Sequence, residues 1–179
     1  MYPREEALIE HYDQHLEYYS VVSNKTLKDI FNWIGRIDNL SILDLGCGTG
    51  LFPNEAVKRG ASCHGIDYSS NRITLAQSKY KHDNLLYSKT DVHEYVQHKS
   101  LKPDIITAWE VLEHLEEPTE LVNLCRKKCS SMFGSVPLNS VYKAHLHVYK
   151  TLEDVQERLN PTEIRFYNNH ALLYWRGDK

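Results

Sequence analysis

Residues 42–50 read Ile-Leu-Asp-Leu-Gly-Cys-Gly-Thr-Gly. An apolar run ends in an acidic residue and then breaks into glycines at alternate positions, which predicts a buried parallel strand and a tight turn. Glycine adopts the backbone angles of such a turn without steric cost and lets a ligand approach the main chain. A helix should follow from about Leu51, with its N-terminus directed at the bound molecule. The dinucleotide pattern Gly-x-Gly-x-x-Gly is excluded, because its last position is occupied by leucine.

The 179 residues are 41% hydrophobic and 25% charged, the composition of an ordinary globular protein. This length predicts a single domain over residues 1–179, with a helical cap at 1–38 and a core at 39–179. The formal net charge of −3 gives no basic field, which makes nucleic acid a less favoured partner than a small molecule. No apolar stretch approaches the roughly 18 residues of a membrane span, so no membrane partner is expected. The sequence does not reveal the oligomeric state.

The four cysteines, at positions 47, 63, 125 and 129, form neither a Cys-x-x-Cys pair nor a zinc pattern. The acidic N-terminus also lacks the apolar segment of a signal peptide. A reducing, cytoplasmic environment is the expectation that follows.

Strand and helix patterns alternate along most of the chain. Before residue 40, apolar residues recur at helical spacing, first at Leu8, Tyr12, Leu16 and Tyr19 and then at Leu27, Ile30, Phe31 and Ile34. Strands are predicted at 41–45, 62–66, 85–88, 104–108, 132–136, 163–167 and 171–175. Helices are predicted at 51–58, 71–79, 92–97, 119–128 and 152–159, the last opened by a capping box from Thr151.

This alternation predicts an α/β fold in which helices cover both faces of a parallel sheet. The last two strands are joined by a connection too short for a crossover, so they should be antiparallel. The fold class is therefore a Rossmann-like, seven-stranded, mostly parallel sheet with an antiparallel last strand.

Two motifs carry a resemblance to a known family. The pattern Asp-x-Gly-x-Gly-x-Gly from Asp44 resembles motif I of the class I S-adenosylmethionine-dependent methyltransferases. The segment 104–115 is similar to the Asp-x₅-Glu-Val-Leu-Glu-His segment of small-molecule O-methyltransferases, including the ubiquinone-pathway type. The resemblance implies the seven-stranded methyltransferase fold, S-adenosyl-L-methionine as cofactor and S-adenosyl-L-homocysteine as product. It implies cofactor contacts from Asp44, Gly46, Cys47, Gly48, Gly50, Asp67, Tyr68, Asp91, Val92 and Trp109.

Three carboxylates have expected roles in this site, each with a structural alternative. Asp67 ends the second strand at the interval where an acid meets ribose hydroxyls, or else it caps the next helix. By resemblance, Asp91 receives the adenine amino group and Val92 donates its backbone N–H, although Asp91 is almost equally well explained as an N-cap. Asp44 resembles the acid that orients the methionyl end near the sulfonium, with a purely structural role as the alternative. Tyrosines of the leading helix, Tyr12, Tyr18 or Tyr19, close over the site or belong to the core.

The predicted catalytic residues are His114, Glu110 and Glu113, which share one face if their segment is helical. His145 and His147 share one side if their segment is extended. The small-RNA 2′-O-methyltransferases resemble this arrangement and hold magnesium on similar residues, so Mg²⁺ on Glu110, Glu113, His114, His145 and His147 is an alternative that we do not favour. A metal-free site with His114 as base or acceptor-positioning residue is the preferred hypothesis, with packing roles for these side chains also open.

The favoured function is O-methylation of a small polar metabolite. The alternatives are a metal-dependent RNA 2′-O-methyltransferase and a non-catalytic cofactor-binding module that supports a partner. The sequence departs from the family pattern where Cys129-Ser130-Ser131 replaces the usual glycine pair, and the fifth strand is weakly apolar. The motif typical of amino-group methylation of adenine or glutamine is absent after the fourth strand, as is the Pro-Cys of cytosine methylation.

Overall fold

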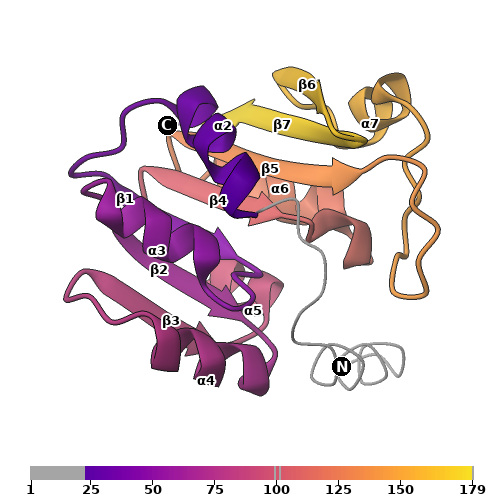
Figure 1. Ribbon diagram of the computed structural model, residues 1–179. Coiled ribbons are helices and arrows are strands. Elements are labelled where there is room, and N and C mark those ends of the chain that lie inside the picture. Colours follow the sequence, from indigo (N-terminus) through magenta and orange to yellow (C-terminus); the bar gives the residue numbers. More distant parts are fainter. Residues whose placement is uncertain (1–22, 99, 101, 179) are drawn as a thin grey trace.

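The structure is a computed structural model that describes residues 23–98, 100 and 102–178. Its centre is a seven-stranded sheet in the order β3-β2-β1-β4-β5-β7-β6 (Figure 1). The strands are β1 (Ser41–Leu45), β2 (Ser62–Asp67), β3 (Leu85–Lys89), β4 (Ile105–Trp109), β5 (Ser131–Pro137), β6 (Glu163–Tyr167) and β7 (His170–Arg176). All pairings from β3 to β5 are parallel, and β7 is antiparallel to both of its neighbours. The predicted fold class is confirmed.

Helices cover both faces of this sheet, as the alternation predicts. One face packs against α2 (Asn24–Ile34), α3 (Leu51–Lys58) and α4 (Ser70–Lys79). The other packs against α5 (Val92–His98), α6 (Pro118–Arg126) and α7 (Leu152–Leu159). A short 3₁₀ helix, η1 (Leu112–His114), follows β4.

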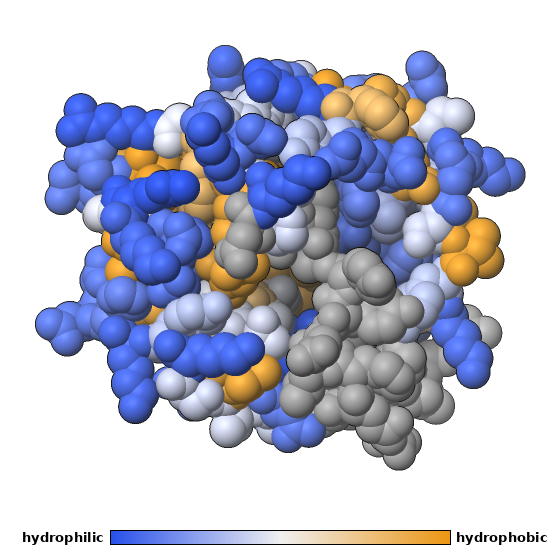
Figure 2. Space-filling view, in the orientation of Figure 1, coloured by the Kyte–Doolittle hydropathy of each residue, from blue (hydrophilic) through white to orange (hydrophobic). Residues whose placement is uncertain are grey.

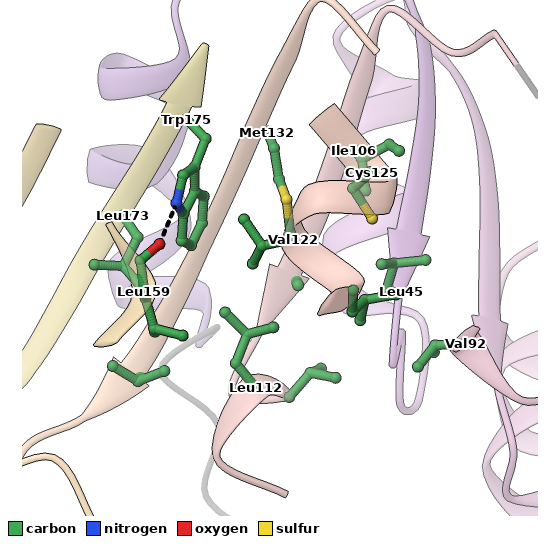
Figure 3. Close-up of a cluster of buried hydrophobic side chains, with 14 of the residues drawn as sticks. Leu45, Val92, Ile106, Leu112, Val122, Cys125, Met132, Leu159, Leu173 and Trp175 are labelled. Carbon is green, nitrogen blue, oxygen red and sulfur yellow. Dashed lines mark hydrogen bonds between the residues drawn. The ribbon is translucent and has the colours of Figure 1, made fainter. Parts of the chain in front are cut away.

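Side chains of each strand alternate between the two faces, as the period of two requires. In β4, Ile105 and Trp109 join the α2–α4 side of the core, while Ile106 and Ala108 join the α5–α7 side. Figure 3 shows the α5–α7 side, where Trp175 is almost fully buried and its Nε1 donates a hydrogen bond of 3.0 Å to the carbonyl oxygen of Leu159. Burying each large side chain of this kind contributes about 1.5–3 kcal/mol.

Strand β5 is regular despite its weak apolar pattern. All seven of its residues pair with β7. Gly134 packs so closely on β4 that an added Cβ would lie 2.6 Å from the carbonyl oxygen of Ala108. Ser135 is fully buried and hydrogen-bonded to Glu110, so its hydroxyl is satisfied inside the fold. Both departures from an apolar strand therefore have a packing reason.

The turn before β5 also forms without the usual glycine pair. The backbone N–H groups of Ser130 and Ser131 both donate to the carbonyl oxygen of Asp104, at 3.0 and 3.2 Å. The remaining predicted elements agree with the structure to within one or two residues. The proposed helix through Leu8 and Tyr19 lies outside the described residues, and the helical cap is represented by α2.

Charged and polar side chains cover most of the face shown in Figure 2, with small apolar patches between them. In the part of the chain that the structure describes, none of the helices combines the length and apolar character needed to cross a membrane.

Candidate cofactor and acceptor site

A cleft of about 1640 Å³ opens at the carboxyl ends of the parallel strands, where ligands bind in open α/β sheets. It collects residues from the glycine turn, the end of β2, the segment after β4 and the segment after β5. Most of the predicted site residues line it: Asp44, Gly46, Cys47, Gly48, Asp67, Tyr68, Asp91, Val92, Trp109, Glu110, Glu113, His114 and His145. Gly50 and His147 are not among its lining residues.

The glycine turn is built from left-handed backbone conformations. Gly46 has φ +65°, and an added Cβ there would lie 2.5 Å from Cγ2 of Val111. Gly50 has φ +83°, and its Cβ would overlap the hydroxyl of Tyr87, which donates a hydrogen bond to the Gly50 carbonyl. Gly50 therefore packs against Tyr87 beneath the turn, and its contact with the cofactor stays a prediction.

Asp67 fixes the turn from the end of β2. Its carboxylate accepts hydrogen bonds from the backbone N–H of Gly48 at 2.9 Å and of Ser69 at 2.8 Å. The N-cap of α4 is Ser69, so the alternative in which Asp67 merely caps that helix is wrong. Burial raises the pKa of Asp67, although these two hydrogen bonds and the charge of Arg72 act to lower it. The carboxylate lies in the cleft beside the turn, and its binding of the ribose hydroxyls stays a prediction.

Asp44 is buried at the end of β1 and accepts a hydrogen bond of 2.5 Å from the hydroxyl of Thr107 on β4. Burial raises its pKa to about 8, against the opposing effect of that bond. At neutral pH the ligand-free protein therefore holds this carboxyl mostly protonated, and a cation bound beside it would favour its ionised form.

Asp91 caps α5. Its Oδ1 accepts a hydrogen bond of 2.9 Å from the backbone N–H of Glu94, which is the N-cap arrangement considered as its alternative role. The side chain still lies on the rim of the cleft, as does the buried Val92 next to it.

Two further groups face the same cleft. Trp109 is buried at the end of β4, and its Nε1 has no hydrogen-bond partner among the described residues. Arg72 extends from α4 to the glycine turn, where its Nη1 would lie 3.4 Å from a Cβ added to Gly48. Sequence reasoning missed Arg72, and the only available signal was a cation in the first turn of the helix after Asp67.

Glu113 and His114 lie at the base of the acceptor side. Glu113 is fully buried, and within the described residues neither carboxyl oxygen has a hydrogen-bond partner. Its Oε1 is 3.5 Å from Nε2 of His114. Burial, and then the charge of Glu110, raise the pKa of Glu113 well above its usual value. Burial also lowers the pKa of His114 to about 4, so the imidazole is neutral near pH 7.

The tautomer of His114 follows from its contacts. Its Nδ1 lies 3.0 Å from the carbonyl oxygen of Ala144, so in the neutral ring Nδ1 carries the proton and donates it there. Nε2 is then the acceptor nitrogen. His145 has the same arrangement, with its Nδ1 at 3.0 Å from the carbonyl oxygen of Ser140. The two rings pack edge to face with centroids 4.8 Å apart.

Two predictions about this region are wrong. Only residues 112–114 are helical, so Glu110 does not share a face with Glu113 and His114. Glu110 has φ +57° and contacts Ser135 and His170 instead. His145 and His147 do not share a side either, because their segment is a series of turns and no strand runs through it.

His147 contacts other segments than His145 does. Its Nε2 is 2.9 Å from the carbonyl oxygen of Leu115, and its Nδ1 is 2.8 Å from Nη2 of Arg158. Of the five residues considered for a metal site, the structure therefore brings together Glu113, His114 and His145, with one ligand atom from each within 4.8 Å of the others.

The glycine turn, the strand-end acids and the sheet order agree with what a comparison with known proteins finds. A family profile described as "Methyltransferase domain" matches residues 9–176. The chain belongs to this methyltransferase family. The family predicted from the sequence is confirmed.

Relatives of this methyltransferase include ubiquinone biosynthesis O-methyltransferases. That of Acinetobacter baylyi is 29% identical over 64% of this chain and 50% of its own length. That of Actinobacillus pleuropneumoniae serotype 7 is 30% identical over 66% of this chain and 54% of its own length. The chain thus spans about half the length of these curated relatives.

A solved structure, magnesium protoporphyrin IX methyltransferase from Synechocystis with bound S-adenosylhomocysteine, superposes with a TM-score of 0.72. It is 14% identical, over 97% of this chain and 100% of its own. This likeness supports the fold.

The residues of this methyltransferase fit S-adenosylmethionine. In the turn, side chains at Gly46 and Gly50 would clash, and Asp67 lies beside it. The buried N–H of Trp109 in the same cleft has no hydrogen-bond partner within the described residues. Gly48, Asp67, Asp44 and Trp109 are the residues that would hold the cofactor.

Proposed function

We propose that this methyltransferase transfers a methyl group to a hydroxyl of a small polar metabolite. The observation that supports the proposal most strongly is the position of His114, a neutral imidazole in the same cleft as the glycine turn and Asp67. The names of the relatives, O-methyltransferases, favour the same acceptor atom.

The protein contributes mainly by aligning the methyl donor with the acceptor, because the transfer needs no covalent intermediate with the protein. S-adenosylmethionine supplies, when bound, a methyl group on a sulfonium that is a good leaving group. Holding two reactants aligned and dry can supply about 7–11 kcal/mol of the barrier. A hydroxyl acceptor also needs a group that takes its proton.

In this proposal His114 accepts that proton at Nε2. Its Nδ1–H is held by the carbonyl oxygen of Ala144, which fixes the ring orientation. Because its pKa is lowered to about 4, the ring is unprotonated at neutral pH. The walls on this side combine apolar and aromatic groups: Pro137, Leu138, Val141, Tyr142 and Leu146. Such a lining favours a small organic acceptor over a phosphate backbone.

The proposal is tested by measuring S-adenosylhomocysteine formation with a panel of phenols, alcohols, amines, thiols and a short RNA. The wild type should turn over a hydroxyl acceptor, with the product identified by NMR as a methyl ether. The role of His114 is tested with His114→Gln in the same assay. His64→Gln is its matched control, because His64 is a half-buried histidine on β2 that does not line the cleft. Turnover of amines alone would contradict the proposal, and no turnover at all would favour the non-catalytic module.

A second candidate, metal-assisted hydroxyl methylation, is favoured by the cluster of Glu113, His114 and His145. A buried carboxylate and two imidazoles, each ring holding its Nδ1–H on a backbone carbonyl, form a donor set that suits a divalent ion. Such an ion would polarise the acceptor hydroxyl. Calorimetric titration of magnesium and manganese into the protein saturated with S-adenosylhomocysteine tests this candidate. Saturable binding that is lost in Glu113→Ala would support it, and no binding would leave His114 as the leading base.

A further inference from the structure

Glu110 is held in the cleft by contacts from two neighbouring strands. Its backbone N–H donates to the carbonyl oxygen and the hydroxyl of Ser135, both at 3.2 Å. The Ser135 hydroxyl donates back to Oε1 of Glu110 at 2.8 Å. Oε2 of Glu110 lies 3.2 Å from Nε2 of His170, the first residue of β7. The carboxylate therefore has a defined position with a different neighbour on each oxygen.

His170 meets an acceptor at each ring nitrogen. Nε2 faces the Glu110 carboxylate, and Nδ1 lies 2.7 Å from the carbonyl oxygen of Asn168. Only a doubly protonated ring satisfies both contacts, so the geometry pairs an imidazolium with a carboxylate. Burial lowers the pKa of His170, but the hydrogen bond and charge of Glu110 outweigh this and raise it overall. Tyr167 lies opposite His170 on β6. Of the described residues around the ring, Glu110 is the one whose charge acts on it.

The backbone conformation of Glu110 indicates that surrounding contacts hold the residue in this position. A φ of +57° is unusual for a glutamate and persists only where surrounding contacts hold it. Residues in such conformations concentrate at binding sites. Glu110 and His170 both line the cleft, with side chains 17% and 23% exposed, so the pair is accessible to an acceptor.

We propose that His170 is a positioning residue for methyl transfer, which with Ser135 holds the Glu110 carboxylate where it binds a hydrogen-bond donor of the acceptor. The inference rests on the proposed function, because it assigns the pair to the acceptor side of that same cleft. His170 lies in the sequence Asn168-Asn169-His170 at the hairpin turn, more than fifty residues from the motif after β4.

The pair itself is tested without turnover. NMR titration of the His170 ring, assigned by its loss in His170→Gln, should give a pKa above the ordinary histidine range in the wild type. In Glu110→Gln the pKa should fall, because the negative charge is removed. A His170 pKa that is the same in both proteins would overturn the pairing.

The positioning role is tested by a double-mutant cycle on the hydroxyl acceptor that the wild type turns over best. His170→Gln should lower kcat/KM by about tenfold or more, the size expected for a hydrogen bond to a charged group. S-adenosylhomocysteine affinity should be unchanged. Glu110→Gln/His170→Gln should lose no more than Glu110→Gln alone, because His170 acts through Glu110. His64→Gln serves as the control for loss of a half-buried histidine.

Losses that multiply in the double variant would overturn the proposal, as would a His170→Gln enzyme with normal kinetics. A wild type that methylates no acceptor would overturn the proposed function, and with it the role in methyl transfer. The NMR titration of His170 distinguishes the two cases, because it tests the Glu110–His170 pairing without any turnover.

Discussion

Replacing Glu113 by methionine should stabilise the ligand-free protein, by an amount that grows with pH. The carboxyl is fully buried, and both oxygens lack a hydrogen-bond partner within the described part of the chain. Burial raises its pKa well above the usual 4.5, so the folded protein holds this proton to a higher pH than the unfolded chain does. The stability from this group is fully present below pH 4.5 and is lost as the pH rises toward the folded-state pKa.

The size of the effect follows from the pKa difference. Each unit between the unfolded-state pKa and the working pH costs about 1.4 kcal/mol. Above the unfolded-state pKa the ionisable carboxyl therefore destabilises the folded state increasingly as the pH rises, and methionine of similar volume removes that cost. Loss of an unsatisfied polar group adds about 1–3 kcal/mol that does not depend on pH.

Urea unfolding at about pH 5 and about pH 7 measures this prediction. The stability difference between Glu113→Met and wild type should be larger at about pH 7 than at about pH 5, because the pKa of Glu113 is raised in the folded protein. Glu117→Met, at an exposed position after η1, should show no such increase. A difference that is independent of pH would refute the reasoning, because it would mean that Glu113 is ionised in the folded protein.

Three other substitutions test separate parts of the site. Wild-type affinity for S-adenosylmethionine relative to S-adenosylhomocysteine should rise as the pH approaches the Asp44 pKa of about 8, since the cation favours the ionised carboxylate. In Asp44→Asn, calorimetry should show that this pH dependence of the relative affinity is lost. If the pH dependence persists, a group other than Asp44 causes it. His114→Gln should lower turnover about 10²–10⁴-fold with little change in S-adenosylhomocysteine affinity, and a normal rate would make His114 structural. Gly46→Ala should destabilise the protein by about 1–3 kcal/mol through its clash with Val111, and an unchanged thermal midpoint would contradict that packing.

The sheet and the cofactor side were predictable because their signals are local. Apolar strands, the glycines of the turn and Asp67 at a strand end are all defined by short-range sequence patterns. Parallel strands then bring their carboxyl ends to one edge, so a one-dimensional pattern fixes a three-dimensional site.

The acceptor side was less predictable because it depends on contacts between distant segments. The left-handed conformation of Glu110 follows from its bonds to Ser135 and His170, which belong to other strands. His145 and His147 have different hydrogen-bond partners because they lie in an irregular segment, where the alternation of a strand does not apply. Arg72 reaches the site through a long side chain on a helix whose pattern indicates only packing.

We expect the cofactor to bind in the cleft, anchored on Asp67 and the glycine turn. Calorimetric titration of S-adenosylhomocysteine into the wild type and Asp67→Ala tests it most directly, with circular dichroism to verify that the variant is folded. We predict saturable binding at one site per chain, weakened in the variant by about 1–3 kcal/mol through lost charge-assisted hydrogen bonds. Absence of binding by the wild type, or the same affinity in a folded variant, would contradict the claim.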